Sequence, residues 1–110
     1  MEKLMKGDVV VIPFPYSDLS RSKKRPALVA ATIDGDDVIL CQITGEMRLD
    51  RYSVGVTGED FIEGNLNFPS IIRPNRLFTA DTSVIIRKIG AIKKDKMKEV
   101  EREIVGIFRG

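Results

Sequence analysis

The chain has 110 residues, 43% of them apolar and 31% charged, a composition that predicts one compact domain with a charged surface. It contains no histidine and no tryptophan, and Cys41 is its single cysteine. These counts exclude a histidine-dependent catalytic triad and a Cys/His zinc site. A lone cysteine forms no internal disulfide, so we expect a cytoplasmic protein. No apolar run reaches the ~18 residues that a membrane span needs, and no signal-peptide pattern opens the chain, so we expect no membrane partner.

The net charge of +2 is concentrated in one segment. Residues 20–33 include Arg21, Lys23, Lys24 and Arg25 and no acid. Without these four cations the chain has 14 basic and 16 acidic residues, so the positive balance is local. Such a patch is typical of a contact site for a polyanion, although a solvated basic loop has the same composition.

In chain order, the first predicted elements are strands. Residues 9–12 are a β-branched run that we expect to end at Pro13 and Pro15, and residues 16–24 form a predicted loop. Pro26 opens a second predicted strand over residues 27–33. The Asp-Gly turn at residues 34–37 leads into a third strand, residues 38–44.

The second half of the chain continues this pattern and then changes period. Residues 45–51 form a predicted polar loop, and residues 52–56 a fourth strand. Thr57 is a candidate N-cap for one helical turn through Phe61, with Asp60 three residues on. After a predicted loop at 64–69 come strands over 70–77 and 84–89. A helix over 94–108 is predicted because one stripe of apolar residues follows a helical period: Met97, Val100, Ile104, Ile107 and Phe108.

Five or six short strands, tight turns and one terminal helix predict a mainly-β domain over residues 1–110. We expect a small barrel over about residues 7–92 that closes its own sheet edges.

Two candidate sites are better explained as ordinary structural features. The acids at 34, 36 and 37 belong to a hairpin signal and lack the rest of a calcium-loop pattern. Cys41 lies in an apolar run with no histidine to activate it, so we expect a core residue. Glycine-rich nucleotide-binding patterns are absent. We therefore expect no metal and no other cofactor.

The remaining candidates are guanidinium and hydroxyl groups near strand ends. Arg25 precedes the second strand, Thr44 ends the third, and Arg73 lies in the strand after the long loop. Arginine has a planar donor fork that fits phosphate oxygens, and threonine adds a hydroxyl donor. Such a set can hold a phosphate and stabilise the charge that develops on it during reaction. Structural ion pairs of Arg25 and Arg73, with acids such as Asp8 or Asp81, are the alternative.

Four separated blocks in matching order resemble the MazF/PemK family of toxins. The blocks are Gly7-Asp8-Val9-Val10 with Pro13-Phe14-Pro15, Lys24-Arg25-Pro26-Ala27-Leu28-Val29, Ile39-Leu40-Cys41-Gln42-Ile43-Thr44, and Ile72-Arg73-Pro74-Asn75-Arg76-Leu77-Phe78-Thr79. The resemblance implies an SH3-like barrel that forms a homodimer. It implies the toxin of a type II toxin-antitoxin system, a metal-independent endoribonuclease that cleaves single-stranded RNA at short sequences. It further implies a cognate antitoxin protein as partner, DNA binding together with that antitoxin, and attack by the ribose 2′-hydroxyl that leaves a cyclic phosphate and a 5′-hydroxyl.

Residue by residue, the resemblance carries the catalytic roles to Arg25, Thr44 and Arg73. Some family members have an acid two positions after the arginine that matches Arg73, and this acid is proposed as the base. This chain has Asn75 at that position, and its neutral amide cannot take a proton. Ser22 stands where many relatives have glycine. The residues expected to contact RNA, each of which could also be an ordinary loop residue, are Arg21, Ser22, Lys23, Lys24, Arg48, Asn65, Asn67, Phe68 and Asn75.

Two other functions stay open at this point. One is a catalytically weak or inactive barrel that binds RNA or protein without cutting it, which the amide at Asn75 would fit. The other is a toxin on the same barrel that acts on DNA gyrase, although the Arg-Pro and Gln-Ile-Thr blocks argue against it.

Overall fold

The computed structural model describes residues 3–15, 22–46 and 50–110, without the side chains of residues 14, 15 and 22. Two residues expected to bind RNA, Arg21 and Arg48, lie outside the described residues, as does the side chain of Ser22. The strands are β1 (Asp8–Pro15), β2 (Ser22–Thr32), β3 (Asp37–Thr44), β4 (Val54–Val56), β5 (Phe61–Gly64), β6 (Ser70–Asp81) and β7 (Arg87–Ile92). Two 3₁₀ turns, η1 (Gly58–Asp60) and η2 (Thr82–Val84), and one helix, α1 (Lys94–Arg109), complete the described elements.

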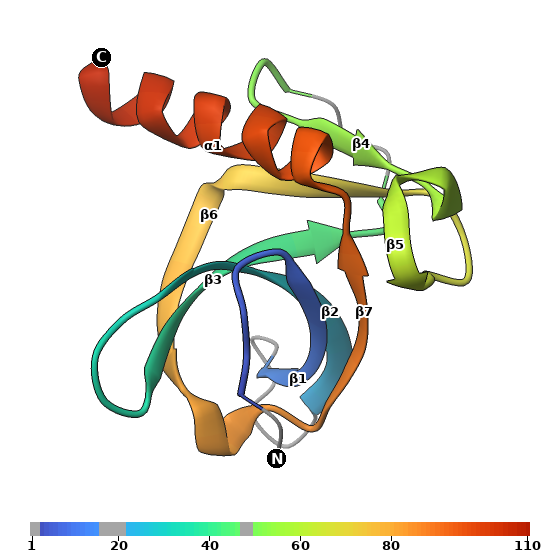
Figure 1. The fold of residues 1–110 in the computed structure, drawn as a ribbon, viewed down its shortest axis with the longest axis vertical. Coiled ribbons are helices and arrows are strands. Elements are labelled where there is room, and N and C mark those ends of the chain that lie inside the picture. The colour runs from blue at the N-terminus through green and yellow to red at the C-terminus, as the bar shows by residue number, and fades with distance from the viewer. Residues whose placement is uncertain (1–2, 16–21, 47–49) are drawn as a thin grey trace.

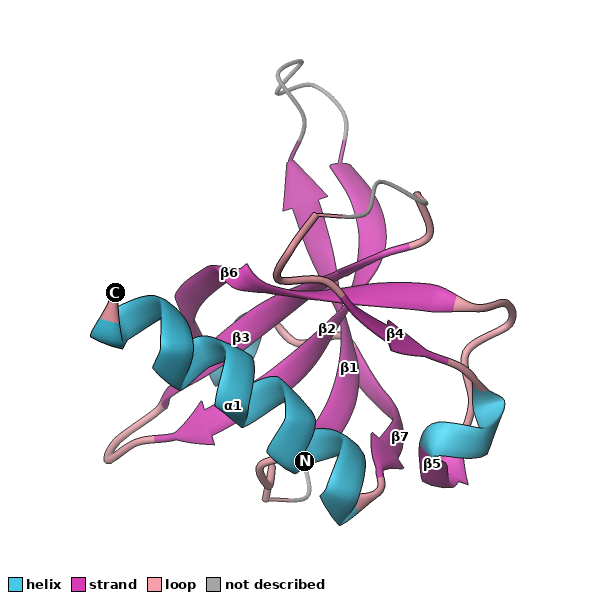
Figure 2. Ribbon diagram, turned by 90° about the horizontal axis from the view of Figure 1, so that it is seen from above, coloured by secondary structure: helices cyan, strands magenta, loops and turns pink. Residues whose placement is uncertain are grey.

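The strands form one antiparallel sheet in the order β4-β6-β3-β2-β1-β7-β5. The sheet curls strongly, and α1 lies across one side of it beside β4 and β6 (Figure 1). The β1–β2 hairpin extends away from the helix (Figure 2). This arrangement confirms the mainly-β, barrel-like fold with a C-terminal helix. Among the described residues the edge strands β4 and β5 each pair with one neighbour, so the barrel is a curled half-barrel.

The two faces of the curled sheet carry two apolar clusters. Alternation along β3 gives Cys41 and Ile43 to one cluster and Val38 and Leu40 to the other. The first cluster is completed by Met97 and Val100 of α1, which confirms the first half of the predicted helical stripe. The last residue of that stripe was placed wrongly, because the Phe108 side chain is 77% exposed.

Several strand boundaries differ from those predicted. β1 does not end at Pro13 but runs on to Pro15, paired with β2. The pairing of β1 with β7 stops at Val11, so the later part of β1 is an edge on that side among the described residues. Proline is tolerated there because no partner strand needs its missing N–H donor. β2 correspondingly begins at Ser22, within the predicted loop.

Two short elements also depart from the prediction. β5 was missed, since Phe61–Gly64 directly follows the η1 turn and shows no alternation. Residues 84–86 are not strand; Asp81 caps η2 by accepting a hydrogen bond from the Ser83 N–H at 2.8 Å. By contrast, the predicted turn after Thr57 is present, and the Asp60 carboxylate accepts from the Thr57 N–H at 2.8 Å. The hairpin over residues 34–37 is also confirmed, with Gly35 at a φ of 87°.

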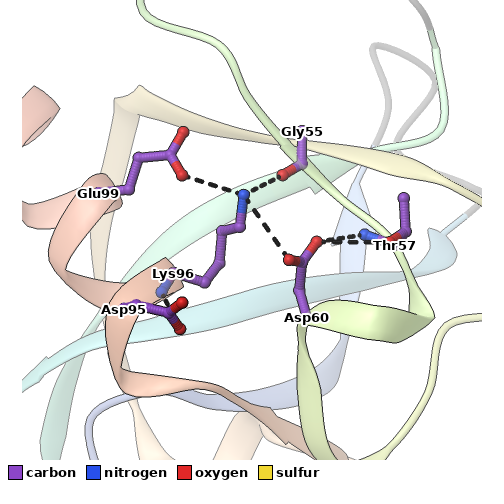
Figure 3. Close-up of polar contacts among 6 residues, drawn as sticks. All are labelled: Gly55, Thr57, Asp60, Asp95, Lys96 and Glu99. Atoms are coloured by element: carbon purple, nitrogen blue, oxygen red, sulfur yellow. Dashed lines mark hydrogen bonds and ion pairs between the residues drawn. The ribbon is translucent and has the colours of Figure 1, made fainter.

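A lysine ties α1 to the segment before β5. Figure 3 shows the Lys96 ammonium donating to the Gly55 carbonyl at 3.0 Å and contacting the carboxylates of Glu99 at 3.0 Å and Asp60 at 3.8 Å. The Lys96 side chain is 17% exposed, so its contacts are partly shielded from water. They hold the helix, β4 and η1 together. Of the helices that the structure describes, none has the length and apolar character to span a bilayer.

Candidate functional site

The three candidate catalytic residues share one face of the sheet. The register pairs Gln42 of β3 with Ala27 of β2 and with Arg73 of β6, and it pairs Thr44 with Ile71. Paired residues lie on the same face of a sheet, and so do residues two apart on one strand. Thr44 therefore shares a face with Gln42, and Arg25 shares that face with Ala27. Thr44 and Arg73 are thus diagonal neighbours, which puts their Cβ atoms roughly 7–8 Å apart. The fold therefore brings these side chains to one region.

Thr44 is fixed by its own strand end. The residue is 7% exposed, and its Oγ1 accepts a hydrogen bond from the Glu46 N–H at 3.1 Å. This contact uses a lone pair of the hydroxyl and leaves its hydrogen available for an acceptor such as a phosphate oxygen. The turn after β3 thus orients the hydroxyl without consuming its donor.

Arg73 contacts an acid that the sequence did not point to. Its Nη2 lies 3.3 Å from Oδ2 of Asp50, while its buried Nε has no hydrogen-bond partner among the described residues. The alternative of a structural ion pair is thus confirmed for Arg73, with Asp50 as its partner, whereas Asp8 contacts Lys88 at 3.4 Å. The pKa of Asp50 lies below its usual range, above all because the Tyr52 N–H donates a hydrogen bond to its carboxylate. The contact with Arg73 lowers this pKa further. Asp50 therefore stays ionised at neutral pH and neutralises part of the Arg73 charge.

Cys41 supports the backbone of Arg73. The register between β3 and β6 jumps here, from Cys41 opposite Leu77 to Gln42 opposite Arg73. The Cys41 thiol donates to the Arg73 carbonyl at 3.0 Å, so the irregularity does not leave that carbonyl without a donor. Burial raises the pKa of the thiol to about 12, which confirms the core interpretation and excludes a thiolate nucleophile at neutral pH. Asn75, within the irregular stretch, is exposed.

A groove next to this face collects four of the nine residues expected to bind RNA. Its volume is about 210 Å³, and its lining includes Lys23, Lys24, Arg25, Asn67 and Phe68, together with Gly45 beside Thr44. Phe68 is 62% exposed, and its ring lies against Gly45 so closely that a Cβ there would be 2.7 Å from it. Glycine at this position leaves room for the exposed ring of Phe68 beside the end of β3.

The other candidates lie outside this groove. Thr44, Arg73 and Asn75 are not among its lining residues, and Asn65 lines the adjoining groove. The lining residues include no acid, so the local potential is positive. No three histidine, cysteine or acidic side chains gather in the described part of the chain as a metal site would need.

Sequence reasoning missed several residues of this region. Gln42 lies between Ala27 and Arg73 in the sheet, and strand alternation with Thr44 could have found it. Asp50, Leu66, Arg87 and Lys88 reach the region only through the fold, and no local pattern marks them.

Comparison with known proteins agrees with this fold. Residues 5–108 match the model of the PemK-like, MazF-like toxins of type II toxin-antitoxin systems, so the chain belongs to that family. No curated protein matches the chain.

Solved structures share the fold at low sequence identity. The Mycobacterium tuberculosis toxin MazF-mt6 superposes with a TM-score of 0.69 and 19% identity, covering 91% of this chain and 96% of the toxin. A mycobacterial endoribonuclease in complex with its cognate antitoxin gives a TM-score of 0.76 at 14% identity, with 97% and 96% covered. MazF from the MazE-MazF complex of Deinococcus radiodurans gives 0.74 at 15% identity, with 94% of both chains covered. At these identities the likeness establishes the fold.

Proposed function

We propose that the protein is the endoribonuclease toxin of its toxin-antitoxin pair and cleaves single-stranded RNA without a metal ion. The observation that carries the proposal is the shared face of Arg25, Thr44 and Arg73 beside a groove lined by cations and without acids. Family membership and the likeness to a mycobacterial endoribonuclease support it.

The proposed reaction is a transesterification within the RNA. The ribose 2′-oxygen forms a bond to the adjacent phosphorus, the bond from phosphorus to the 5′-oxygen breaks, and the 2′-proton is lost while the leaving oxygen gains one. The phosphate becomes more negative on the way, and the Arg25 guanidinium and the Thr44 hydroxyl are proposed to bind it most strongly at that stage.

The arginines act through charge more than through proton transfer. A guanidinium with a pKa above ~12 is a poor proton donor, so Arg25 and Arg73 serve as fixed cations. The neutral amide of Asn75 takes no proton, and the lowered pKa of Asp50 makes that carboxylate a weak base. Rate enhancement is therefore assigned chiefly to electrostatic stabilisation, and Asp50 to the orientation of Arg73.

The groove supplies substrate binding. Lys23 and Lys24 are exposed cations that suit backbone phosphates, and the exposed ring of Phe68 suits base stacking. Asn65 and Asn67 offer amides that can read base edges. The proposed contacts of Arg21, Ser22 and Arg48 rest on the sequence alone.

The proposed partners follow from the family. A cognate antitoxin protein would neutralise the toxin, as implied by the antitoxin-bound mycobacterial and Deinococcus structures. A homodimer, DNA binding together with the antitoxin, a cytoplasmic location and a single domain over residues 1–110 stay predictions.

The proposal is tested by incubating the purified protein with a long RNA in excess EDTA. Wild-type protein should cleave it and leave 5′-hydroxyl ends, which polynucleotide kinase labels without prior phosphatase treatment. Arg25→Ala should cleave far less, whereas Arg102→Ala, an equal charge change on the exposed surface of α1, should cleave like wild type.

The same assay separates the alternatives. RNA binding without cleavage by wild-type protein would identify an inactive binding module. Neither binding nor cleavage, with inhibition of purified gyrase, would identify a toxin that acts on gyrase.

A further inference from the structure

A second groove adjoins the first on the far side of Arg25. It has a volume of about 490 Å³, within the ~300–1,000 Å³ of typical ligand sites. The two grooves share Lys24, Arg25, Pro26, Leu66 and Asn67, so they are two halves of one surface. We call the larger half the Arg87 groove.

The Arg87 groove has an apolar floor and a cationic rim. Val11, Pro26, Leu66 and Ile89 provide apolar surface, and Lys24, Arg25, Arg87 and Lys88 provide positive charge. No acidic residue is among the described residues that line it. This combination suits a nucleotide unit, whose sugar and base lie on an apolar surface while its phosphate meets cations.

The sheet register explains how Arg87 reaches this groove. Val11 of β1 pairs with Pro26 on one side and with Arg87 on the other, so the three residues form one row across β2, β1 and β7. Two strand spacings, roughly 10 Å, separate the ends of this row. The register thus places Arg87 in one row with Pro26, and both Arg25 and Arg87 line this groove although 62 residues separate them in the chain.

The two cations of β7 differ in their partners. Lys88 contacts Glu63 at 3.1 Å and Asp8 at 3.4 Å, and the hydrogen bond to Glu63 above all raises the pKa of the lysine. Arg87 is exposed and makes no ion pair with any described acid. Its guanidinium is thus available for a ligand, whereas the charge of Lys88 is partly offset by two carboxylates.

We propose that Arg87 forms a second phosphate-binding subsite, which holds the backbone of single-stranded RNA one or more nucleotides away from the bond that is cleaved. The inference rests on the proposed function and extends it. RNA passing from Phe68 over Arg25 to Arg87 meets an aromatic ring and then two guanidinium groups along one surface. Arg87 is a binding residue for the flanking strand and takes no part in bond cleavage.

The test compares Arg87→Gln with Arg102→Gln, which removes the same charge from an exposed position on α1. The probe is a mixed-sequence RNA 12-mer with 2′-O-methyl groups throughout, which cannot undergo 2′-hydroxyl attack, and binding is followed by fluorescence anisotropy from 50 to 300 mM salt. Loss of one phosphate contact should reduce the slope of log K against log salt by about 0.7. Affinity at 150 mM salt should fall about two- to fivefold. Arg102→Gln should match wild type in both.

A cleavage assay separates binding from catalysis. With a long transcript, Arg87→Gln should raise KM and leave kcat unchanged, as expected when binding is lost equally in the ground and transition states. A fall in kcat at unchanged KM would overturn the assigned role.

The failures are distinguishable. If wild type binds with a salt slope and cleaves RNA while Arg87→Gln matches it throughout, the subsite is refuted and the proposed function stands. If Arg87→Gln weakens binding of a glutamate-rich peptide but leaves RNA binding unchanged, the groove is a protein site and the inference is wrong. If wild type neither binds nor cleaves RNA, the proposed function fails first.

Discussion

Alkaline pH should destabilise the protein through Cys41. Burial raises the pKa of this thiol from 9.0 to about 12 in the folded state, while the unfolded chain leaves the thiol in water with its ordinary pKa. Between these values the unfolded state has released a proton that the folded state retains, so rising pH favours unfolding. Each pH unit above 9 should lower the free energy of unfolding by about 1.4 kcal/mol, or about 3 kcal/mol by pH 11.

The assay is urea unfolding followed by far-UV circular dichroism, from pH 7 to 11 under reducing conditions, for wild type and Cys41→Ala. The variant should be less stable at pH 7 by about 1–3 kcal/mol, since the part-buried Arg73 carbonyl loses its donor. The difference should shrink as the pH rises, because only wild type has the buried thiol and loses its contribution. Groups such as Lys88 titrate in both proteins and cancel. Cys41→Ser keeps a donor for the carbonyl and should regain part of the loss at pH 7. Parallel pH profiles of wild type and Cys41→Ala would refute the buried, protonated thiol.

Three further variants test the fold and the site. Gly64→Ala should destabilise the protein by about 2 kcal/mol or more, as measured by urea unfolding, because φ is +68° and a Cβ would clash with the Ile89 carbonyl oxygen of β7. Gly55→Ala, with open space around it, is the control and should change stability little. Lys96→Met should lower the free energy of unfolding by about 1 kcal/mol and Tm by roughly 4–8 °C, since α1 loses its polar contacts with Gly55 and Asp60. An unchanged Tm in a thermal scan would show that these contacts do not stabilise the fold. Thr44→Ala should reduce RNA cleavage at least ~10-fold in a folded protein. Thr44→Ser keeps the hydroxyl and should retain most of the activity. Equal cleavage rates for the two variants would show that the hydroxyl has no role in the reaction.

The sequence predicted the elements whose signals are local. The β-branched run at the start of β1, the Asp-Gly hairpin, the turn after Thr57 and the helix each depend on neighbours within a few residues. β5 was missed because its four residues become a strand only through pairing with β7. The prolines of β1 were misinterpreted because their effect depends on which side of the strand has a partner, and topology decides that.

The candidate site shows the same division. Arg25 and Thr44 could be selected for chemistry suited to phosphate, and Thr44 ends β3 as predicted; Arg25, expected before the second strand, lies inside β2, because this strand begins at Ser22. The contact between Arg73 and Asp50, the support from Cys41 and the position of Arg87 arise from strand register between distant segments. Charge and alternation in the sequence do not encode these juxtapositions, so only the folded chain reveals them.

The most direct test of the central claim is the single-turnover cleavage rate at one mapped RNA site in EDTA. Arg25→Ala should lower this rate ~10²–10³-fold, the usual effect of removing one donor to a developing oxyanion, while its circular dichroism spectrum stays that of wild type. Arg102→Ala should cleave at the wild-type rate. A folded Arg25→Ala protein that cleaves as fast as wild type would contradict the account.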